Sequence, residues 1–540
     1  MTATQTTKYY DVVIVGAGFA GLYMLHRLRN AGRSVIVFER GDEVGGTWYW
    51  NRYPGARCDV ESLQYCYSFP EAEDTGWRWS ERFSAQPEIW AYARHIADKL
   101  DLRRDISFTK RVTAATFNEA KGRWYVETDK GDSVESQFCI MATGNLSEPT
   151  VPNLPGISDF KGAIYHTGAW PRVEPDFTGR RVGVIGTGSS GIQAVPELAR
   201  RADEVVVFQR TANFSVPARN RPLTDDDYEA FKAQYPNRRA VARRTFSGTI
   251  LPRSLGVNAI DAGPELANAE FALRWGWEKG GGASFLNAFD DLMVSRESNA
   301  IAADFVRQKI KEIVTDPEVA ASLCPKGYPI GAKRLACDTG YYETFNSPNV
   351  KLVDLKKTPL ECVTGDGLRT SEGEYLLDDL VFATGFDAGT GAISRIDVRG
   401  RQGKQLKDVW SQHPSSYLGL MIAGFPNLFT ITGPGSPAIL TNLLVSIEYH
   451  VEWIDRCIAD LEAAGHTIIE PTEWAQEAWS TEVAKTVEGT LFLEADSWYM
   501  GANVEGKPRV FMAYAGGVHA YENRCETIVA QGYTGFDRRG

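Results

Sequence analysis

Two stretches of the chain share one order of hydrophobic and polar positions. Residues 11–40 read DVVIVGAGFAGLYMLHRLRNAGRSVIVFER, and residues 181–210 read RVGVIGTGSSGIQAVPELARRADEVVVFQR. Each stretch begins with a β-branched apolar run, passes through GxGxxG into a segment with helical periodicity, and ends in a second apolar run. This order predicts a strand, a tight turn, a helix and a second strand, which is the nucleotide-binding unit of a Rossmann-like domain.

The glycines of each motif suit a turn that holds a pyrophosphate. The first glycine permits the tight turn, the second lets the backbone approach the anion, and the third lets the helix pack on the strand. The N–H groups at the start of the helix then point at the anion. A single GxGxxG is often only a glycine-rich turn, whereas two in the same context indicate two nucleotide sites. The expected contacts are Gly16, Gly18, Ala20 and Gly21 in the first site, and Thr187, Gly188, Ser189, Ser190, Gly191, Ile192 and Gln193 in the second.

The residue that ends each second strand distinguishes the two nucleotides. Glu39 can accept both hydrogen bonds of an adenosine ribose diol, which suits FAD or NAD. The second copy has Gln209 at the matching position, followed by Arg210. A guanidinium suits the 2′-phosphate of NADPH, although an ordinary surface arginine at a strand end is the alternative. We therefore expect FAD in the first site and NADPH in the second. Further candidates for the phosphate contact are Thr211, Lys333 and Arg334.

Two later apolar runs end in the same tripeptide, Ala-Thr-Gly. They are CIMATG at 139–144 and LVFATG at 380–385, and each could bring the chain back past a nucleotide. Between residues 220 and 330 the pattern becomes helical, as in 299–314, where charges lie on one side of the periodic stretch. Residues 448–465 have the pattern of a late amphipathic helix that ends at a glycine.

These patterns predict an α/β fold with two Rossmann-like dinucleotide-binding domains, the second inserted in the first, and a helical excursion. The expected FAD-binding domain consists of 1–148 and 385–540, and its second part carries an active-site loop. The expected NADPH-binding domain consists of 149–220 and 331–384, with a helical subdomain at 221–330.

Composition and charge limit the class of protein. The 43% hydrophobic and 24% charged residues are typical of a soluble globular enzyme. A net charge of −11 argues against a nucleic-acid partner, whose phosphates require a basic surface. The apolar run at 11–25 is too short to cross a membrane. We expect a cytoplasmic enzyme with no nucleic-acid or membrane partner, present as a monomer or a weak homo-oligomer.

The eight cysteines form no CxxC pair and no cluster with metal-ligand spacing. They indicate a reduced protein rather than a disulfide scaffold, and no metal is expected. A flavin-dependent disulfide reductase would need a redox-active cysteine pair, so the sequence argues against that class.

The segment FKGAIYHTGAWP at 160–171 fits the pattern FxGxxxHxxxW followed by proline. This pattern, just before a second GxGxxG, is the fingerprint of the Baeyer–Villiger monooxygenases, and the chain resembles that family over most of its length. Relatives that oxygenate amines and sulfides usually have Tyr or Phe where Trp170 stands. The chain looks closest to the phenylacetone and steroid monooxygenase branch. Other matching stretches are GGTWYWNRYPGARCDVES, GAKRLACDTGYYE, GPGSPAILTN and DSWYMGANVEGKPRVF.

The resemblance implies conversion of a ketone to an ester or lactone with NADPH and O2. Hydride from NADPH reduces the flavin, O2 gives a flavin peroxyanion, and attack on the ketone gives a tetrahedral adduct from which a carbon migrates to oxygen. Such a peroxide can also oxidise sulfides. The alternatives are a monooxygenase that oxygenates nitrogen or sulfur, and a flavin-binding protein without catalytic activity.

The family match assigns the catalytic work to two charged residues. Arg334 would stabilise the negative oxygens of the peroxyanion and the adduct, because an arginine is a permanent cation that cannot act as a stray acid. Asp59 would pair with Arg334 and position it, although two surface charges are the alternative. Arg57 and Cys58 are expected in a turn near the nicotinamide of NADP, with Cys58 not acting as a nucleophile.

Other family matches concern the cofactors. Tyr65 would reach the flavin, with a core tyrosine as the alternative. Trp498 would lie on a mobile loop that covers NADP, with a packed loop anchor as the alternative. The remaining FAD contacts implied by the resemblance are Gly46, Thr47, Trp48, Tyr49, Val112 and Leu443.

The last two expectations concern His166 and the substrate. His166 lies in a connection between domains, and we expect it to tune domain movement rather than catalyse. Residues 433–444 are longer by two residues than the matching stretch of cyclohexanone-type enzymes. Ala438, Ile439 and Leu440 would bulge into an apolar ketone pocket. Aryl-alkyl or bulky cyclic ketones should therefore be favoured.

Overall fold

The computed structural model describes residues 8–235, 237–276 and 281–540. Its first sheet has the strand order β17-β4-β5-β6-β1-β2-β3, with β18 beside β6. The central strands β6, β1 and β2 are parallel, whereas β5 is antiparallel to β4 and β6. The strands are β1 Lys8–Val15, β2 Val35–Phe38, β3 Ile106–Ser107, β4 Val112–Asn118, β5 Arg123–Thr128, β6 Ser133–Met141, β17 Asp397–Arg399 and β18 Leu428–Thr430.

The second sheet is parallel throughout, with the order β12-β9-β8-β16-β7. Each of its central strands is apolar on both faces, as expected for a sheet covered on both sides. The strands are β7 Ala163–His166, β8 Arg181–Ile185, β9 Glu204–Gln209, β12 Val350–Asp354 and β16 Asp379–Phe382. Both sheets therefore contain the predicted strand–helix–strand unit, which confirms the expected fold class.

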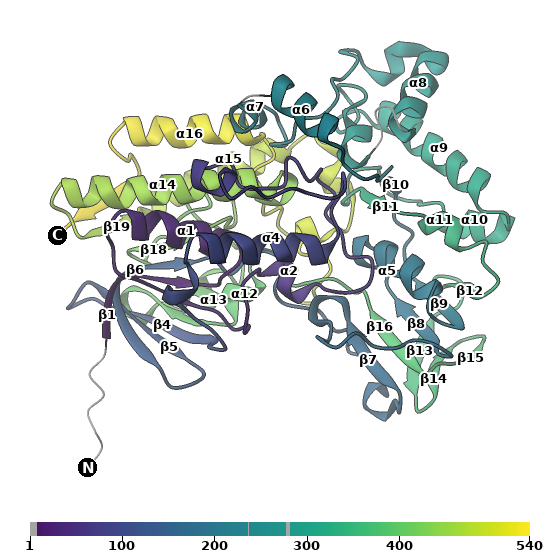
Figure 1. Ribbon diagram of the computed structural model, residues 1–540, viewed down its shortest axis with the longest axis horizontal. Coiled ribbons are helices and arrows are strands. Elements are labelled where there is room, and N and C mark those ends of the chain that lie inside the picture. The colour runs from purple at the N-terminus through teal and green to yellow at the C-terminus, as the bar shows by residue number, and fades with distance from the viewer. Residues whose placement is uncertain (1–7, 236, 277–280) are drawn as a thin grey trace.

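Helices divide between the two sheets and a third region (Figure 1). Helix α1 contacts strands β1 and β2 of the first sheet and packs on α14. The helices in this half of the molecule are α1 Phe19–Asn30, α4 Gln86–Lys99, α14 Leu443–Ala463, α15 Glu473–Val487 and α16 Val518–Ala530. The second sheet carries α5 Ser189–Ala199. Beyond it, as Figure 1 shows at upper right, lie α8 Ala259–Trp275, α9 Arg296–Ile313 and α10 Pro317–Leu323. The helices α6 Asp225–Gln234 and α7 Arg238–Arg243 come between.

Short elements complete the architecture. The helices are α2 Thr47–Trp50, α3 Pro70–Glu73, α11 Tyr341–Thr344, α12 Gly391–Ser394 and α13 Leu406–Val409. The additional strands are β10 Ser215–Pro217 with β11 Ala336–Asp338, the meander β13 Leu360–Thr364, β14 Gly367–Thr370 and β15 Gly373–Leu376, and the pair β19 Ile468–Pro471 with β20 Phe536–Arg539.

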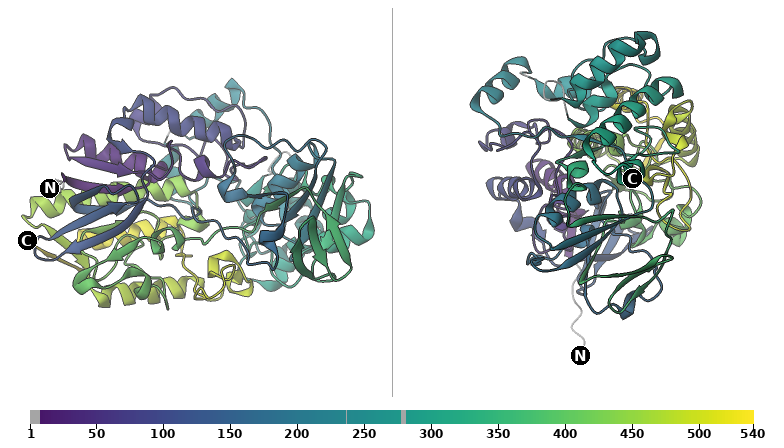
Figure 2. Two further views of the ribbon diagram at one scale, coloured as in Figure 1. Left: turned by 90° about the horizontal axis from the view of Figure 1, so that it is seen from below. Right: turned by 90° about the vertical axis from the view of Figure 1, so that its right-hand side faces the viewer.

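The second sheet interrupts the first in sequence. Strands β17 and β18 join the first sheet only after the chain has left β16, and the two sheets lie side by side (Figure 2). The two connections run antiparallel: Thr150 N donates to Gly385 O at 3.0 Å, and Asp387 N donates to Glu148 O at 2.8 Å. These paired segments join the two halves.

Two helices begin earlier than their periodicity predicted. The pattern at 299–314 corresponds to α9, which starts at Arg296 because Ser295 accepts a hydrogen bond from Ser298 N and caps it. The pattern at 448–465 corresponds to α14, which starts at Leu443 because the side chain of Asn442 accepts from Leu444 N at 3.2 Å.

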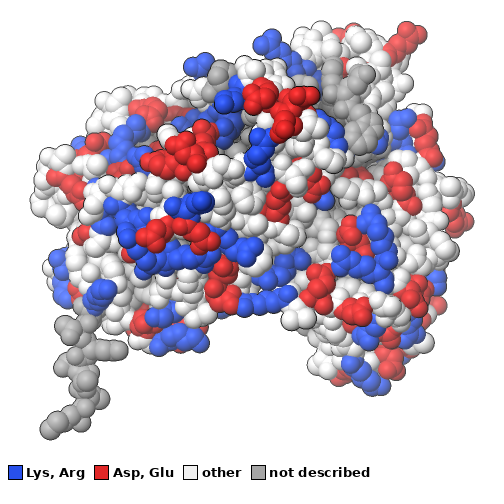
Figure 3. Space-filling view, in the orientation of Figure 1, with Lys and Arg blue, Asp and Glu red and all other residues white. Residues whose placement is uncertain are grey.

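The surface and the helices add two observations. Positive and negative side chains are interspersed over the face drawn in Figure 3, without a broad area of one sign. Among the described residues, no helix has both the length and the apolar character needed to cross a membrane.

Candidate active site

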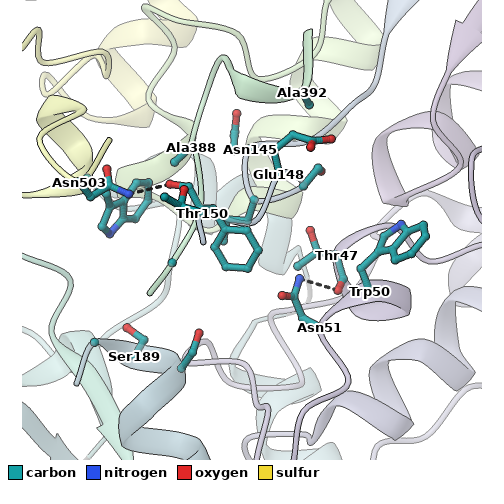
Figure 4. Close-up of a pocket in the computed structure, with 18 of the residues that line it drawn as sticks. Thr47, Trp50, Asn51, Asn145, Glu148, Thr150, Ser189, Ala388, Ala392 and Asn503 are labelled. Carbon is teal, nitrogen blue, oxygen red and sulfur yellow. Dashed lines mark hydrogen bonds between the residues drawn. The ribbon is translucent and has the colours of Figure 1, made fainter. Parts of the chain in front are cut away.

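A cavity of about 1490 Å³ opens where the central strands of both sheets end, at Val15 of β1 and Ile185 of β8. Ligands of open α/β sheets bind beyond the carboxyl ends of the strands. The volume exceeds the range of roughly 300–1,000 Å³ for one small-molecule site, which suits two dinucleotides and a substrate. Figure 4 shows Thr47 and Ser189, from the two halves, facing this space from different sides.

The first glycine motif has a steric reason at each position. Gly16 has φ +105°, and a Cβ there would lie 2.6 Å from the carbonyl oxygen of Ala142, in the first Ala-Thr-Gly tripeptide. A Cβ on Gly18 would lie 3.3 Å from Gly46 Cα, and one on Gly21 only 1.9 Å from Gly16 O. The turn, the close approach and the helix packing that the motif predicted are therefore all present.

The second motif repeats this geometry with one informative difference. Gly186 has φ +109°, and a Cβ there would lie 2.5 Å from Ala383 O, in the second Ala-Thr-Gly tripeptide. A Cβ on Gly191 would lie 2.2 Å from Gly186 O. Apart from the adjoining backbone, no atom of the described residues lies within 4 Å of a Cβ on Gly188, which lines the cavity. The space beside Gly188 is thus open to a ligand, as a pyrophosphate site requires.

Glu39 is a buried carboxylate at the edge of the cavity. It lines the cavity although it is only 4% exposed, and its two oxygens accept hydrogen bonds from Ala17 N and Gly41 N, both at 2.7 Å. Burial raises the pKa of this carboxyl, and the two backbone N–H groups oppose the rise. Each oxygen keeps a second lone pair for a hydroxyl of the cofactor.

Asn51 fits a cofactor in a way that sequence reasoning missed. The side chain is 6% exposed, and its Nδ2 donates to Thr47 O at 2.9 Å (Figure 4). Asn51 lines the same cavity, and its Oδ1 has no hydrogen-bond partner among the described residues. A buried acceptor without a partner is costly, so a hydroxyl or amide of a bound cofactor is its natural donor.

Two cations lie in the cavity wall beyond the second glycine motif. Arg210 is exposed at the end of β9, and Lys333 lines the same cavity. Burial lowers the pKa of Lys333; the charge of Arg210 adds to the lowering, and Asp496 opposes it. The amide of Gln209 points away from the cavity and donates to Ser322 O at 2.8 Å. Arg210 and Lys333 both line the cavity, whereas Gln209 does not.

Asp59 and Arg334 form a bidentate ion pair in the cavity wall. Arg334 Nε donates to Asp59 Oδ2 at 2.7 Å and Nη2 donates to Oδ1 at 2.8 Å. Arg334 Nη1 also donates to the carbonyl oxygen of Ile439 at 3.3 Å. The carboxylate holds the pKa of Arg334 well above its usual value. Burial would raise the pKa of Asp59, but the guanidinium outweighs burial and keeps it below its usual value.

The turn before Asp59 is tied to the second domain. Gln193 on α5 donates from Nε2 to Arg57 O at 3.0 Å and accepts from the Tyr53 hydroxyl at 2.7 Å. Arg57 itself donates to Glu81 at 2.8 Å. Burial raises the pKa of the Cys58 thiol far above its usual value, so Cys58 is a neutral thiol and a poor nucleophile.

Most of the predicted contacts line this cavity. For FAD they are Gly16, Gly18, Ala20, Glu39, Gly46, Thr47, Trp48, Asp59, Tyr65, Val112 and Leu443. For NADP they are Arg57, Cys58, Thr187, Gly188, Ser189, Ser190, Gln193, Arg210, Thr211, Lys333, Arg334 and Trp498. Ala438 and Ile439, predicted for the substrate, also line it.

Five predicted contacts lie behind the cavity wall. Gly21 and Gly191 face the backbone of their own motifs, and Ile192 is fully buried in the core of the second domain. Tyr49 donates its hydroxyl to Asp42 Oδ1 at 2.7 Å, and Leu440 packs into a cluster with Tyr499 and Phe511. These five residues lie outside the cavity lining.

Several lining residues were missed by sequence reasoning. They fall into three groups: residues close to Glu39 and Asn51 in the chain, residues after the two Ala-Thr-Gly tripeptides, and the loop around Trp498. The tripeptides could have pointed to the residues that follow them, since each tripeptide directly follows a central strand, β6 or β16. The missed residues include Arg40, Trp50, Tyr53, Asn145, Glu148, Thr150, Phe386, Ala388, Asp496 and Asn503.

His166 lies outside the cavity lining and against both connections between the halves. Its Nδ1 accepts from Gly168 N at 2.9 Å, so Nε2 carries the proton of the neutral ring. Nε2 lies 3.3 Å from both Thr150 O and Thr384 Oγ1. Burial lowers the pKa of His166, which keeps the ring uncharged near neutral pH.

Comparison with known proteins agrees with this geometry. A family model described as pyridine nucleotide-disulphide oxidoreductase matches residues 13–233, yet all eight cysteines here are free. A Baeyer–Villiger monooxygenase from Pseudooceanicola batsensis is 42% identical over 99% of this chain and 98% of its own. The solved structure of oxidised steroid monooxygenase bound to NADP is 46% identical, covers 99% of this chain and 100% of its own, and superposes with a TM-score of 0.93.

A second solved structure carries both cofactors. It is a complex of OTEMO with FAD and NADP, 39% identical over 99% of this chain and 100% of its own, with a TM-score of 0.94. The identities and coverage extend the likeness across both domains and the helical region. The chain belongs to the Baeyer–Villiger monooxygenase family and is an oxidoreductase that uses FAD and NADPH.

Proposed function

We propose that the protein uses O2 to insert one oxygen atom beside the carbonyl of a ketone, with Arg334 at the reacting centre. The observation that carries the proposal is the Asp59–Arg334 pair, which lies in the wall of the cavity that both nucleotide motifs line. When bound, FAD supplies the activated oxygen and NADPH the hydride. The protein must position the ketone and stabilise the negative charge that develops on oxygen.

Arg334 has the properties that this charge requires. Its guanidinium has five N–H donors, and three of its contacts go to Asp59 and the Ile439 carbonyl. The Tyr499 side chain also lies within hydrogen-bonding reach of the guanidinium. We assign the other N–H groups of Arg334 to an oxyanion in the cavity. Since the pair with Asp59 keeps the guanidinium charged and fixed, Asp59 acts as its positioning residue.

The cofactor contacts follow the two motifs. We assign FAD to the first motif with Glu39 as the ribose acceptor, and NADPH to the second with Arg210 and Lys333 at the 2′-phosphate. Trp498 would cover NADP, and Asn51 would accept a hydrogen bond from a cofactor hydroxyl or amide. These assignments rest on the open space beside Gly188 and the unpartnered Asn51 oxygen.

The substrate side of the cavity supports an apolar ketone. Ala438 and Ile439 line it, so we propose that aryl-alkyl or bulky cyclic ketones are favoured, with sulfides oxidised as well. We also propose that the domain boundaries follow residues 148, 220, 330 and 384. The protein is proposed to be a cytoplasmic monomer or weak homo-oligomer. The strand memberships of the two sheets support that division.

A panel of ketones tests the proposal, with product mass and NADPH consumption measured together on the FAD-loaded protein. We expect esters or lactones that are heavier than the ketone by one oxygen, in proportion to NADPH consumed. A sulfoxide or N-oxide with no ester from any ketone would favour the alternative monooxygenase. NADPH consumption that yields only hydrogen peroxide would overturn oxygen insertion.

A further inference from the structure

The loop around Trp498 forms one wall of the cavity. Residues 496–498 and 502–505 line it, and the 3₁₀ turn Trp498–Met500 lies between these two segments. The ring of Trp498 lies 4.5 Å from that of Tyr499, which is buried. A stretch with so little backbone structure depends on its side chains to hold one conformation.

Lys507 and Asn503 attach this loop to the connection at 386–388. Lys507 Nζ lies 2.6 Å from Asp387 Oδ1 and 2.7 Å from Ala388 O. Asn503 Nδ2 donates to Phe386 O at 2.7 Å, the bond drawn at the left of Figure 4. The loop is therefore fixed at two points to one short segment.

That segment is part of the paired connections between the two halves. Asp387 N donates to Glu148 O at 2.8 Å, and Phe386 forms an antiparallel bridge with Pro149. A change in the arrangement of the halves would move these connections and with them the carboxylate that Lys507 binds. The contact thus links the loop conformation to the relative position of the halves.

The burial of Lys507 distinguishes this ion pair from an ordinary surface pair. Its side chain is only 9% exposed, whereas Arg509 and Asp496 in the same loop form a pair with side chains 64% and 72% exposed. Exposed pairs contribute little to conformation. Burying an ammonium group costs solvation free energy. A buried Lys507 without its carboxylate partner would therefore be strongly disfavoured.

We propose that Lys507 is a positioning residue that latches the loop 496–507 onto Asp387 and Ala388, and so keeps Trp498 over bound NADP. The inference rests on the proposed placement of NADP in this cavity. While Lys507 binds Asp387 and Ala388, the loop covers the nucleotide. Without it, the loop leaves the cavity and the nucleotide dissociates faster.

The test compares Lys507→Met with Arg509→Met, which removes one positive charge from an exposed position two residues beyond Lys507. The FAD-loaded variants are titrated with NADP⁺, and chymotryptic cleavage within the loop is followed with and without NADP⁺. We expect Lys507→Met to bind NADP⁺ about 10- to 100-fold more weakly, the range for a lost charged hydrogen bond, and to be cleaved faster. Arg509→Met should stay within about twofold of the wild type in both measurements.

Two further variants separate positioning from a fold defect. Lys507→Arg keeps the cation and should restore most of the NADP⁺ affinity, and Asp387→Asn should weaken binding without altering residue 507. The double variant of Lys507→Met and Asp387→Asn should be no weaker than the single ones, because both remove one contact. An unchanged FAD spectrum and thermal midpoint would show that the fold is intact.

The latch is wrong if Lys507→Met and Asp387→Asn both bind NADP⁺ as tightly as the wild type and are cleaved by chymotrypsin at the wild-type rate. Should Lys507→Met fail to fold, Asp387→Asn decides alone. Neither measurement requires turnover, so the latch can fail while ketones are still oxygenated. Conversely, a wild type that binds and is protected by NADP⁺ but oxygenates no ketone would overturn the proposed function and leave the latch standing.

Discussion

Arg334 donates two parallel hydrogen bonds to Asp59, with Nε 2.7 Å from Oδ2 and Nη2 2.8 Å from Oδ1. The two residues are 275 positions apart, and each comes from a different half of the chain. Asp59 follows the loop of the first nucleotide site, and Arg334 precedes β11 in the chain that returns from the helical region. The proposed reacting centre is therefore assembled only when both halves are in place.

Replacing Arg334 tests its proposed role. Arg334→Ala should retain FAD, because Arg334 lies away from the first glycine motif, but should form ester about 100- to 1,000-fold more slowly, the usual effect of losing one preorganised donor. Ester formation and flavin absorbance are measured on the same sample.

Arg334→Lys is the matched control for charge. It keeps a cation but cannot bind Asp59 through a planar fork, so its ester yield should lie between those of the wild type and Arg334→Ala. Near-normal ester formation by Arg334→Ala would remove Arg334 from the reacting centre.

The preference for NADPH over NADH should depend on Arg210. A charged hydrogen bond contributes roughly 1.5–3 kcal/mol, so Arg210→Ala should raise the KM for NADPH by about 10- to 100-fold and leave the KM for NADH nearly unchanged. Arg200→Ala, an exposed arginine of the same domain, should change neither. Equal effects of Arg210→Ala on both nucleotides would show that Arg210 does not bind the phosphate.

Glu522 should make stability depend on pH near neutrality. This carboxyl on α16 is partly buried, with its side chain 13% exposed. Its Oε1 has no hydrogen-bond partner among the described residues, and Arg243 Nε lies 3.7 Å away. Burial raises its pKa to about 7; Arg243 and Arg239 oppose the rise, and Glu452 and Glu526 add to it.

The sign of the effect follows from that raised pKa. The folded state keeps a proton that the unfolded state loses, so the stabilisation is complete below the unfolded pKa of about 4.5 and is lost as pH rises through about 7. Glu522→Gln should therefore have a higher Tm than the wild type at about pH 8 and the same Tm at about pH 4. Each pKa unit corresponds to about 1.4 kcal/mol, so the free energies of unfolding of the variant and the wild type should differ by up to about 3 kcal/mol at about pH 8. Glu473→Gln, at an exposed carboxyl, is the control. Equal Tm values for the wild type and Glu522→Gln at about pH 8 would contradict the assignment.

The sequence predicted those parts of the fold and site that local sterics or a pattern of charges dictate. Gly16 and Gly186 could be placed because no side chain fits their turns, and Glu39 because a carboxylate ends the first strand–helix–strand unit. The pairing of Asp59 with Arg334 came from family resemblance. No local pattern joins residues so far apart in the chain.

The parts that were missed depend on tertiary packing. Asn51 is notable only because Thr47 O occupies its amide and leaves its Oδ1 unpartnered beside the cavity. Leu440 was expected on the wall, but the 3₁₀ turn Ala438–Leu440 directs it into the cluster with Phe511. Neither outcome follows from residue type or spacing, since each is set by neighbours distant in sequence.

His166 should affect cofactor binding and turnover rate rather than product formation. Its Nε2 contacts both connections, through Thr150 O and Thr384 Oγ1, and burial lowers its pKa so that it stays neutral. His166→Ala should lose about 1 kcal/mol of hydrogen bonding, which corresponds to about a fivefold weaker affinity for NADPH. The ester formed per NADPH should not change, and His413→Ala, at an exposed histidine, should change neither quantity. A fall in ester per NADPH, with hydrogen peroxide in its place, would move His166 into the chemistry.

The preference among ketones should depend on Ile439. Its side chain lines the cavity, while its carbonyl accepts from Arg334 Nη1 at 3.3 Å, so the wall of the substrate pocket and the reacting arginine are held together. Deleting Ala438 and Ile439 would also remove that carbonyl, and Ile439→Ala is the cleaner change because it shortens only the side chain. An apolar wall discriminates by about 1–3 kcal/mol per methylene-sized misfit, so Ile439→Ala should raise kcat/KM for a bulky steroid ketone relative to cyclohexanone by about tenfold.

Leu440→Ala is the matched control, since Leu440 packs behind the wall and should alter thermal stability more than ketone preference. In the wild type we expect kcat/KM for phenylacetone or a steroid ketone to equal or exceed that for cyclohexanone, because the extra residues of the 433–444 stretch shape an apolar surface with few polar anchors. The three kcat/KM values, measured with wild type and both variants, decide the matter. A clear lead for cyclohexanone over both larger ketones, unaltered by Ile439→Ala, would show that this stretch does not set substrate size.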